Sequence, residues 1–187
     1  VIVGAPYYGS GEDDEGAARL YLGSETGLET GYDNHDEGNK NDAQFGKSVG
    51  TAGDVNGDGY ADVIVGAPYY TNDSSEEGMA FVWYGSAGGI STSRDWDAEG
   101  DAVNANYGYS VATAGDVNGD GYSDIIVGAP GKNTSGGSAF AYYGSSDSVE
   151  DDYGWNKPSN KENAHFGHAV ASAGDVNGDG YADVIVG

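Results

Sequence analysis

A long internal repeat constrains this chain of 187 residues more than any other feature. The segment from Ala52 to Pro68 recurs from Ala114 to Pro130 with two substitutions, and its first 15 residues return from Ala173 to Gly187. Val1 to Pro6 repeats the end of the same segment. A fixed period of this kind is typical of repeat architectures, in which each unit buries its apolar face against its neighbours. The equivalent positions Val1, Val63, Ile125 and Val184 are 62, 62 and 59 residues apart.

Within each unit the apolar stretches are short, rich in β-branched and aromatic residues, and bounded by Gly, Pro, Asn and Asp, which is typical of strands. No segment has a sustained helical period. We expect four strands per unit, which in the first full unit cover Ser48–Ala52, Val63–Val65, Ala80–Tyr84 and the vicinity of Trp96. Small four-stranded sheets repeated along a chain are typical of β-propeller blades. The predicted fold is therefore all-β, with propeller-type blades of four antiparallel strands, three repeat units and incomplete units at both ends.

The repeat also predicts how the chain divides into blades. We expect an incomplete blade with strands two to four over residues 1–40, full blades over 41–103 and 104–162, and the start of another blade over 163–187. The chain starts without Met, so we expect a processed protein or a segment of a longer array. Propellers close with about 4 to 8 blades, and three units alone would leave two sheet faces bare. Two chains could complete a six-bladed ring, or successive chains could stack into a filament.

Each copy contains Asp-Val-Asn-Gly-Asp-Gly-Tyr-x-Asp, the most specific motif in the chain. Oxygen side chains at positions 1, 3 and 5 converge when a loop wraps around a hard cation, and glycine at position 6 permits the sharp turn. By analogy, position 7 offers its backbone carbonyl, and a further carboxylate stands at position 9. An EF-hand would instead carry Glu at position 12 between helices. Position 12 here is a strand valine (Val65, Val127 or Val186), so the EF-hand interpretation fails.

Calcium is the cation that this donor set favours, because Mg²⁺ prefers to keep several waters. The plain alternative is an Asx-rich hairpin turn without metal. A turn alone would not explain three converging carboxylates, which repel one another without a cation. We expect about one Ca²⁺ per loop, or three in the chain. The predicted ligands are Asp54, Asn56, Asp58, the Tyr60 carbonyl and Asp62; Asp116, Asn118, Asp120, Tyr122 and Asp124; and Asp175, Asn177, Asp179, Tyr181 and Asp183.

The charge balance excludes several classes of partner. The chain has 31 Asp and Glu against 7 Lys and Arg, a formal net charge of −24, which three Ca²⁺ would reduce to −18. A polyanion lacks the basic surface that nucleic acid requires, and no apolar run approaches the roughly 18 residues of a membrane span. We therefore expect neither nucleic-acid binding nor membrane insertion.

No catalytic arrangement of Ser, His and Asp stands out from the repeat, so we predict that the chain is not an enzyme.

Two further dipeptide and tripeptide patterns flank each metal motif, and together they carry a resemblance. Phe45-Gly46, Tyr107-Gly108 and Phe166-Gly167 precede the loops, and Gly4-Ala5-Pro6, Gly66-Ala67-Pro68 and Gly128-Ala129-Pro130 close them. The chain resembles the FG-GAP repeats of the integrin α-subunit β-propeller and of many bacterial and archaeal surface proteins. The resemblance implies a cation with a structural role between the first and second strands of each blade, and an extracellular or cell-surface location. Such propellers usually have seven blades, whereas this chain has three units.

The loops after the second strand lie at the opposite end of each blade from the metal motifs, since the strands form an antiparallel meander. All variation in repeat length falls in these loops, and the third copy is shorter by three residues. Their tyrosines form either a protein or glycan contact or local packing; they are Tyr7, Tyr8, Tyr69 and Tyr70. Two sequons for N-glycosylation, at Asn72 and Asn133, lie in the same loops.

The leading hypothesis for function is a Ca²⁺-binding extracellular module with a structural or adhesive role, which associates with other copies of itself. Bare sheet faces at the ends of three units favour such association. One alternative is a ligand-binding propeller of a cell-surface adhesion protein, which recognises a protein or glycan. Another is the non-catalytic propeller part of a secreted enzyme.

Overall fold

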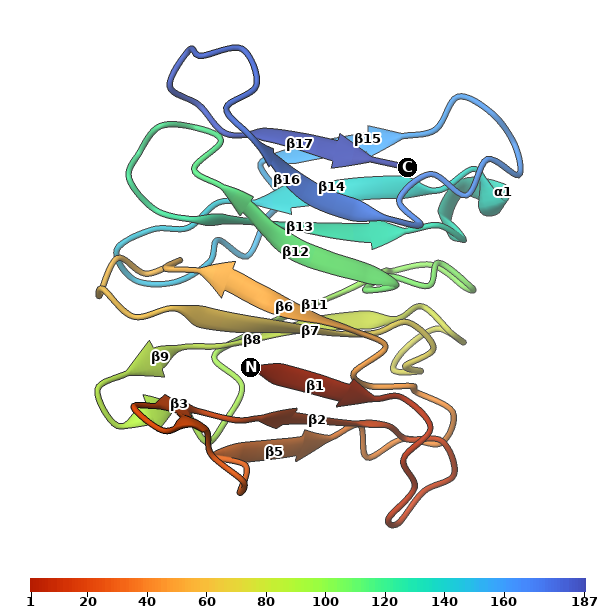
Figure 1. The fold of residues 1–187 in the computed structure, drawn as a ribbon. Coiled ribbons are helices and arrows are strands. Elements are labelled where there is room, and N and C mark those ends of the chain that lie inside the picture. The colour runs from red at the N-terminus through yellow and green to blue at the C-terminus, as the bar shows by residue number, and fades with distance from the viewer.

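The computed structural model describes the backbone of residues 1–187 and all side chains except those of Thr134 and Ser135. Four antiparallel sheets follow one another along the chain and stack face to face (Figure 1). Sheet 1 contains β1 (Ile2–Ala5), β2 (Ala17–Leu20) and β5 (Asn34–Glu37). Sheet 2 contains β6 (Ser48–Gly53), β7 (Asp62–Ala67), β8 (Met79–Trp83) and β11 (Trp96–Glu99). Sheet 3 contains β12 (Ser110–Gly115), β13 (Asp124–Ala129), β14 (Ser138–Tyr142) and β15 (Trp155–Pro158), and sheet 4 contains β16 (Val170–Gly174) and β17 (Asp183–Val186).

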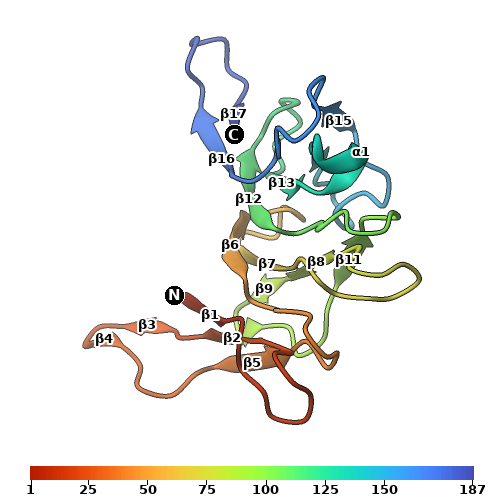
Figure 2. The same ribbon diagram turned by 90° about the vertical axis from the view of Figure 1, so that its right-hand side faces the viewer.

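Within each sheet every strand pairs with its neighbour in sequence, which makes each sheet a meander. Figure 2 shows the consequence for the stack: β6, β12 and β16 lie next to one another along one side, and β11 and β15 lie on the other side of their sheets. The predicted all-β fold of antiparallel propeller-type blades is confirmed. In the described residues, no helix is long and apolar enough to cross a membrane.

Three short elements were not predicted. Two-stranded hairpins form between the third and fourth strands: β3 (Gly23–Ser24) with β4 (Gly27–Leu28), and β9 (Gly85–Ser86) with β10 (Gly89–Ile90). Strands of two residues are too short to produce a pattern in sequence. A single helical turn, α1 (Lys132–Ser135), occupies the shortened loop of the third copy.

The core lies between the sheets. Phe45, Phe81 and Trp83 fill the space between sheets 1 and 2, with ring centroids 5.6–6.1 Å apart. A second cluster lies between sheets 2 and 3, where the Tyr107 and Tyr142 hydroxyls are hydrogen-bonded at 2.7 Å. Because β13 has a sheet on each side, all six of its residues are buried. This double coverage explains why its apolar run is continuous rather than alternating.

The glycines of the Phe-Gly and Gly-Ala-Pro motifs set how closely the sheets approach. The Gly46 N–H donates to the Gly66 carbonyl of its own sheet at 3.0 Å. A Cβ added to Gly66 would overlap the carbonyl oxygen of Gly108 on the next sheet. The same overlap would occur at Gly4 and Gly128. Each repeat therefore needs glycine at this position, because backbone from the next sheet occupies the space of a side chain.

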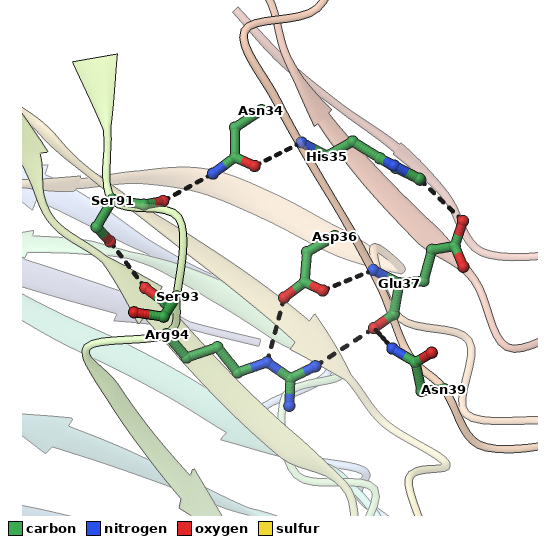
Figure 3. Close-up of polar contacts among 8 residues, drawn as sticks. All are labelled: Asn34, His35, Asp36, Glu37, Asn39, Ser91, Ser93 and Arg94. Atoms are coloured by element: carbon green, nitrogen blue, oxygen red, sulfur yellow. Dashed lines mark hydrogen bonds and ion pairs between the residues drawn. The ribbon is translucent and has the colours of Figure 1, made fainter. Parts of the chain in front are cut away.

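A polar cluster joins the outer strands of sheets 1 and 2 (Figure 3). The Arg94 Nε donates to Asp36 Oδ2 at 3.2 Å, and its Nη2 donates to the Glu37 carbonyl at 3.3 Å. The guanidinium carbon also lies 4.2 Å from the Phe81 ring centroid. Arg94 thus ties the loop before β11 to β5, while its flat face covers the aromatic core.

Replacing Gly66 by alanine tests the close approach of sheets 2 and 3. We expect Gly66→Ala to lower the free energy of unfolding by about 1–3 kcal/mol or more, because a packed interface cannot accept the extra methyl group. Gly31→Ala is the matched control, since nothing lies within 4 Å of a Cβ at Gly31. Chemical denaturation of both variants measures the effect, and equal stabilities would contradict the packing argument.

Candidate metal centres

The three acidic loops connect β6 to β7, β12 to β13 and β16 to β17, and all lie on the left-hand side of the stack in Figure 1. In the first loop, Gly57 and Gly59 have positive φ angles of 71° and 89°. Residues other than glycine rarely adopt this conformation, which allows the chain to reverse within a few residues. Local sequence therefore determines the shape of the loop.

The first two acidic positions of the loop bind backbone N–H groups. Asp54 accepts from the Asp58 N–H at 3.1 Å through Oδ1 and from the Gly59 N–H at 2.9 Å through Oδ2. Asn56 Oδ1 also accepts from the Asp58 N–H, at 3.1 Å, and Asp58 Oδ1 accepts from the Tyr60 N–H at 2.9 Å. The loop thus gathers its side-chain oxygens on the inside of one turn. Equivalent bonds occur at Asp116, Asn118 and Asp120, and at Asp175, Asn177 and Asp179.

The aspartate at position 9 connects the loop to the strand that follows. Asp62 is fully buried, and its Oδ2 accepts from the Val55 N–H at 2.8 Å. Its Oδ1 accepts from the Gly85 N–H of the β9–β10 hairpin, also at 2.8 Å. Asp124 binds the corresponding N–H groups in sheet 3. In sheet 4, Asp183 accepts from the Val176 N–H at 2.8 Å.

Burial is the main cause that raises the pKa of Asp62 to about 6; two backbone N–H groups oppose the rise, and the neighbouring charges of Asp58 and Asp54 add to it. Burial likewise raises the pKa of Asp124 to about 6. At neutral pH, the ionised form of each carboxylate is therefore destabilised compared with an aspartate in water. Both ion pairs found in the described residues lie elsewhere, between His35 and Glu37 and between Arg94 and Asp36.

The donor set fits a hard cation by its chemistry, since each loop offers carboxylate and amide oxygens and no nitrogen or sulfur ligand. In the described part of the chain, no three His, Cys, Asp or Glu side chains are grouped closely enough to hold a metal ion. The oxygens instead accept the backbone N–H groups described above. The tyrosine carbonyls and the complete ligand sets stay predictions.

The first two loops are also braced by the next sheet, which the sequence did not indicate. A Cβ added to Gly57 would meet the Tyr122 ring at 2.5 Å, and one added to Gly119 would meet the Tyr181 ring at 2.6 Å. The Asp54 carbonyl accepts from the Ser123 N–H at 2.9 Å. The tyrosine at position 7 thus packs its ring on the preceding loop. The sequence shows only that the copies follow one another; it does not show that the tyrosine of one copy lies on the loop of the copy before.

At the end of the sheets opposite the acidic loops, the two tyrosines of each pair have different surroundings. Tyr8 packs near Arg19, whose guanidinium lies 5.2 Å from the ring centroid, and Tyr70 packs edge-on to Phe81 at 6.0 Å. Tyr7 is 64% exposed. Burial raises the pKa of Tyr69, and the neighbouring Tyr109 raises it further. One member of each pair therefore packs on its own sheet.

Two buried glutamates in the same loops were not singled out by the sequence. Glu77 accepts three backbone N–H groups through Oε1, from Asn72, Asp73 and Ser74 at 2.8–3.1 Å. Glu15 accepts two in the first copy, and these hydrogen bonds lower its pKa. Each carboxylate thus holds its loop together through several backbone hydrogen bonds. The third copy has α1 in place of such a loop.

The two sequons differ in what the structure describes. Asn72 is exposed, and its Nδ2 donates to Glu99 Oε2 at 3.1 Å. Asn133 lies in α1 and is exposed, with Nδ2 2.7 Å from Ser138 Oγ. The side chains of Thr134 and Ser135, which complete that second sequon, lie outside the described residues. Glycosylation of either asparagine stays a prediction.

Comparison with known proteins identifies the repeats. The family model for the FG-GAP repeat matches residues 45–83, 107–142 and 166–187. Integrin alpha pat-2 of Caenorhabditis briggsae is 33% identical over 211 residues, covering 100% of this chain and 16% of the integrin. Integrin alpha-4 of Xenopus laevis is 30% identical, covering 80% of this chain and 15% of its own length. Integrin alpha-7 of Mus musculus is 37% identical, covering 76% of this chain and 12% of its own length.

This chain therefore spans about a sixth of the length of the curated relatives that it matches. The predicted extracellular or cell-surface location is confirmed by these relatives and by the repeats themselves. Three matched repeats, together with relatives that align along the whole chain, show that the protein belongs to the FG-GAP repeat family.

Proposed function

We propose that the chain is a calcium-stabilised propeller module with a structural or adhesive role outside the cell. The observation that carries this proposal is the repeated loop of three carboxylates and one amide. In each of the first two loops, one of those carboxylates is buried and has a raised pKa. A divalent cation held by the loop oxygens would supply the missing positive charge. Its contribution would be electrostatic and structural rather than catalytic.

The residues that would hold the ions are the predicted ligand sets. In the first loop, Asp54, Asn56 and Asp58 already face the inside of the turn, and Asp62 anchors the loop to sheet 2. Nine of the 31 acidic residues belong to the three loops, so three Ca²⁺ would change the formal net charge from −24 to −18.

The relatives support an adhesion-type role, because integrin alpha subunits carry the same repeats. Since the chain covers only about a sixth of such a protein, its partners are part of the proposal. We take the module to be non-catalytic and to associate with other copies of itself, or with a protein or glycan.

Calcium titration tests the metal sites. We expect about one Ca²⁺ per loop, and a gain of about 2.7 kcal/mol in unfolding free energy for each site when free calcium is 100 times its dissociation constant. Asp58→Asn should remove about one ion, because it deletes a charged ligand. Asp97→Asn, an exposed aspartate of β11, is the matched control and should remove none. Equilibrium dialysis and thermal unfolding with and without chelator measure both quantities; three fully calcium-insensitive loops would refute the proposal.

The raised pKa values predict an unusual pH dependence for the calcium-free protein. A carboxylate whose folded pKa exceeds its ordinary value of 3.8 contributes its full stability below about pH 4 and loses it as pH rises through about 6. Relative to Asp62→Asn, the natural chain should therefore lose about 1–2 kcal/mol between pH 4 and 7 in chelator. A pH-independent difference in unfolding free energy between the two proteins is expected as well, because an amide has one acceptor oxygen where the carboxylate has two. Unfolding curves of the two proteins that run parallel across this range would contradict the assignment.

A ligand-binding role is the second candidate, and one cavity favours it. At the end of the sheets opposite the metal loops, a cavity of about 340 Å³ lies between Asn104, Asn106, Tyr109, Pro130, Gly131, His165 and His168. The Tyr109 and His168 rings are 4.6 Å apart. Its walls carry amides and aromatic rings but no carboxylate, unlike most of this acidic surface.

Binding to a panel of immobilised neutral oligosaccharides and extracellular-matrix proteins tests this role. We expect Tyr109→Ser to weaken any specific binding at least tenfold, because it removes an aromatic wall of the cavity. Tyr153→Ser, which changes an exposed tyrosine of another loop, should leave binding unchanged. Equal binding by both variants would remove the cavity from consideration.

A further inference from the structure

Each acidic loop contains an asparagine followed directly by glycine, and the sequence has this dipeptide nowhere else. Glycine has no side chain to shield its backbone nitrogen, so this nitrogen can approach the side-chain amide of the residue before it. An amide carbon and a nitrogen held in one chain react far more readily than the same groups on separate molecules. The pairs Asn56-Gly57 and Asn118-Gly119 both lie in loops that the next sheet covers.

The side-chain amide is held in the same way in both loops. Asn56 Oδ1 accepts from the Asp58 N–H at 3.1 Å, and Asn56 Nδ2 donates to Asp58 Oδ2 at 3.2 Å. The equivalent distances between Asn118 and Asp120 are 3.0 and 2.8 Å. An N–H that points at a carbonyl oxygen stabilises the negative charge that forms there when a nucleophile adds to the carbon. Each loop thus prepares its amide for attack.

The glycine nitrogen, which would be the nucleophile, differs between the two loops. The Gly119 N–H donates to Asp116 Oδ1 at 2.6 Å. Among the residues that the structure describes, the Gly57 N–H has no acceptor, and Asp54 accepts from Asp58 and Gly59 instead. The bond to Asp116 fixes the Gly119 peptide plane, and the nearby carboxylate opposes negative charge on the nitrogen. The Gly57 nitrogen is therefore the freer of the two.

We propose that Asn56 is a site of self-modification, which converts through a cyclic imide into aspartate and isoaspartate when the loop holds no cation. In the first step the Gly57 nitrogen bonds to Asn56 Cγ and the Cγ–Nδ2 bond breaks. The proton of the N–H group passes through solvent to the departing amide, which leaves as ammonia. Water then opens the imide. Attack at the side-chain carbonyl gives aspartate, and attack at the main-chain carbonyl gives isoaspartate. Water has access, since Gly57 and Asp58 are exposed.

Isoaspartate at position 56 would disrupt the loop, because it lengthens the main chain by one methylene group. The two hydrogen bonds of Asp54, to the Asp58 and Gly59 N–H groups, close the turn across position 56. A longer chain between these residues separates the oxygens that the turn gathers. This consequence rests on the proposed calcium site and deepens it: without calcium, the first loop would lose its ability to bind the ion permanently.

Peptide mapping by mass spectrometry, on the natural chain kept in chelator at neutral pH, tests the proposal. We expect Asn56 to convert roughly tenfold faster than Asn118. Exposure alone predicts the reverse order, since Asn118 is exposed and Asn56 is half-buried. Asn72 is the internal control, because it is exposed but precedes Asp73 rather than glycine, and it should stay unchanged. Equal rates at Asn56 and Asn118, or a faster Asn118, would overturn the proposal.

The variant Asp116→Ala tests the cause of the difference. It removes the acceptor of the Gly119 N–H, so conversion of Asn118 should rise to about the rate of Asn56. The rate at Asn56 in the same molecules should not change, which shows that the fold is retained. If Asn118 kept its slow rate in this variant, the hydrogen bond would not be what protects it, and the explanation would fail.

Calcium separates this inference from the proposed function. When free calcium is 100 times the dissociation constant, conversion of Asn56 should slow about a hundredfold, because only the ion-free loop reacts. The aged chain should bind about one ion fewer once its first loop carries isoaspartate, whereas a fresh Asn56→Asp variant should bind the full number. Conversion of Asn56 at one rate with and without calcium would contradict the calcium site and leave the modification in place. No conversion in chelator would overturn the modification and leave the calcium site in place.

Discussion

Burial of each small sheet between two others is the constraint on which this structure depends. The apolar runs of β7 and β13 are continuous, so a sheet covered on one face would leave half of each run in water. Coverage on both faces requires close stacking, and glycine at Gly66 and its equivalents permits it. The same requirement explains why the repeat is conspicuous at the level of single residues: each copy must fit the copy before it and the copy after it.

Stacking also determines the state of the acidic loops. Asp62 is buried because its loop is held between its own hairpin and the next sheet, and burial is the main cause of its raised pKa. The demand for a cation therefore arises from packing as much as from sequence. Metal binding and blade stacking are expected to stabilise each other.

Much of the fold could be predicted because the repeat aligns its own strands and turns. The apolar run after Asp62 and the turn glycines are local signals, and they indicated the β-strands and the acidic hairpin correctly. Contacts between copies carry no local signal: the Tyr122 ring on Gly57 and the Gly85 N–H bound to Asp62 depend on how two segments meet. For the same reason, the predicted ligand set could be named from spacing, but its engagement with backbone N–H groups could not.

Hydrogen exchange of the backbone amides tests the central claim about stacking most directly. At a concentration where the chain is monomeric, the slowest exchange is expected in β7 and β13, which have a sheet on each side. Amides of β1 and β17 should exchange far faster, although the side chains of these strands are nearly the same. Equal protection of all four strands would show that each sheet is stable by itself, and would contradict the account.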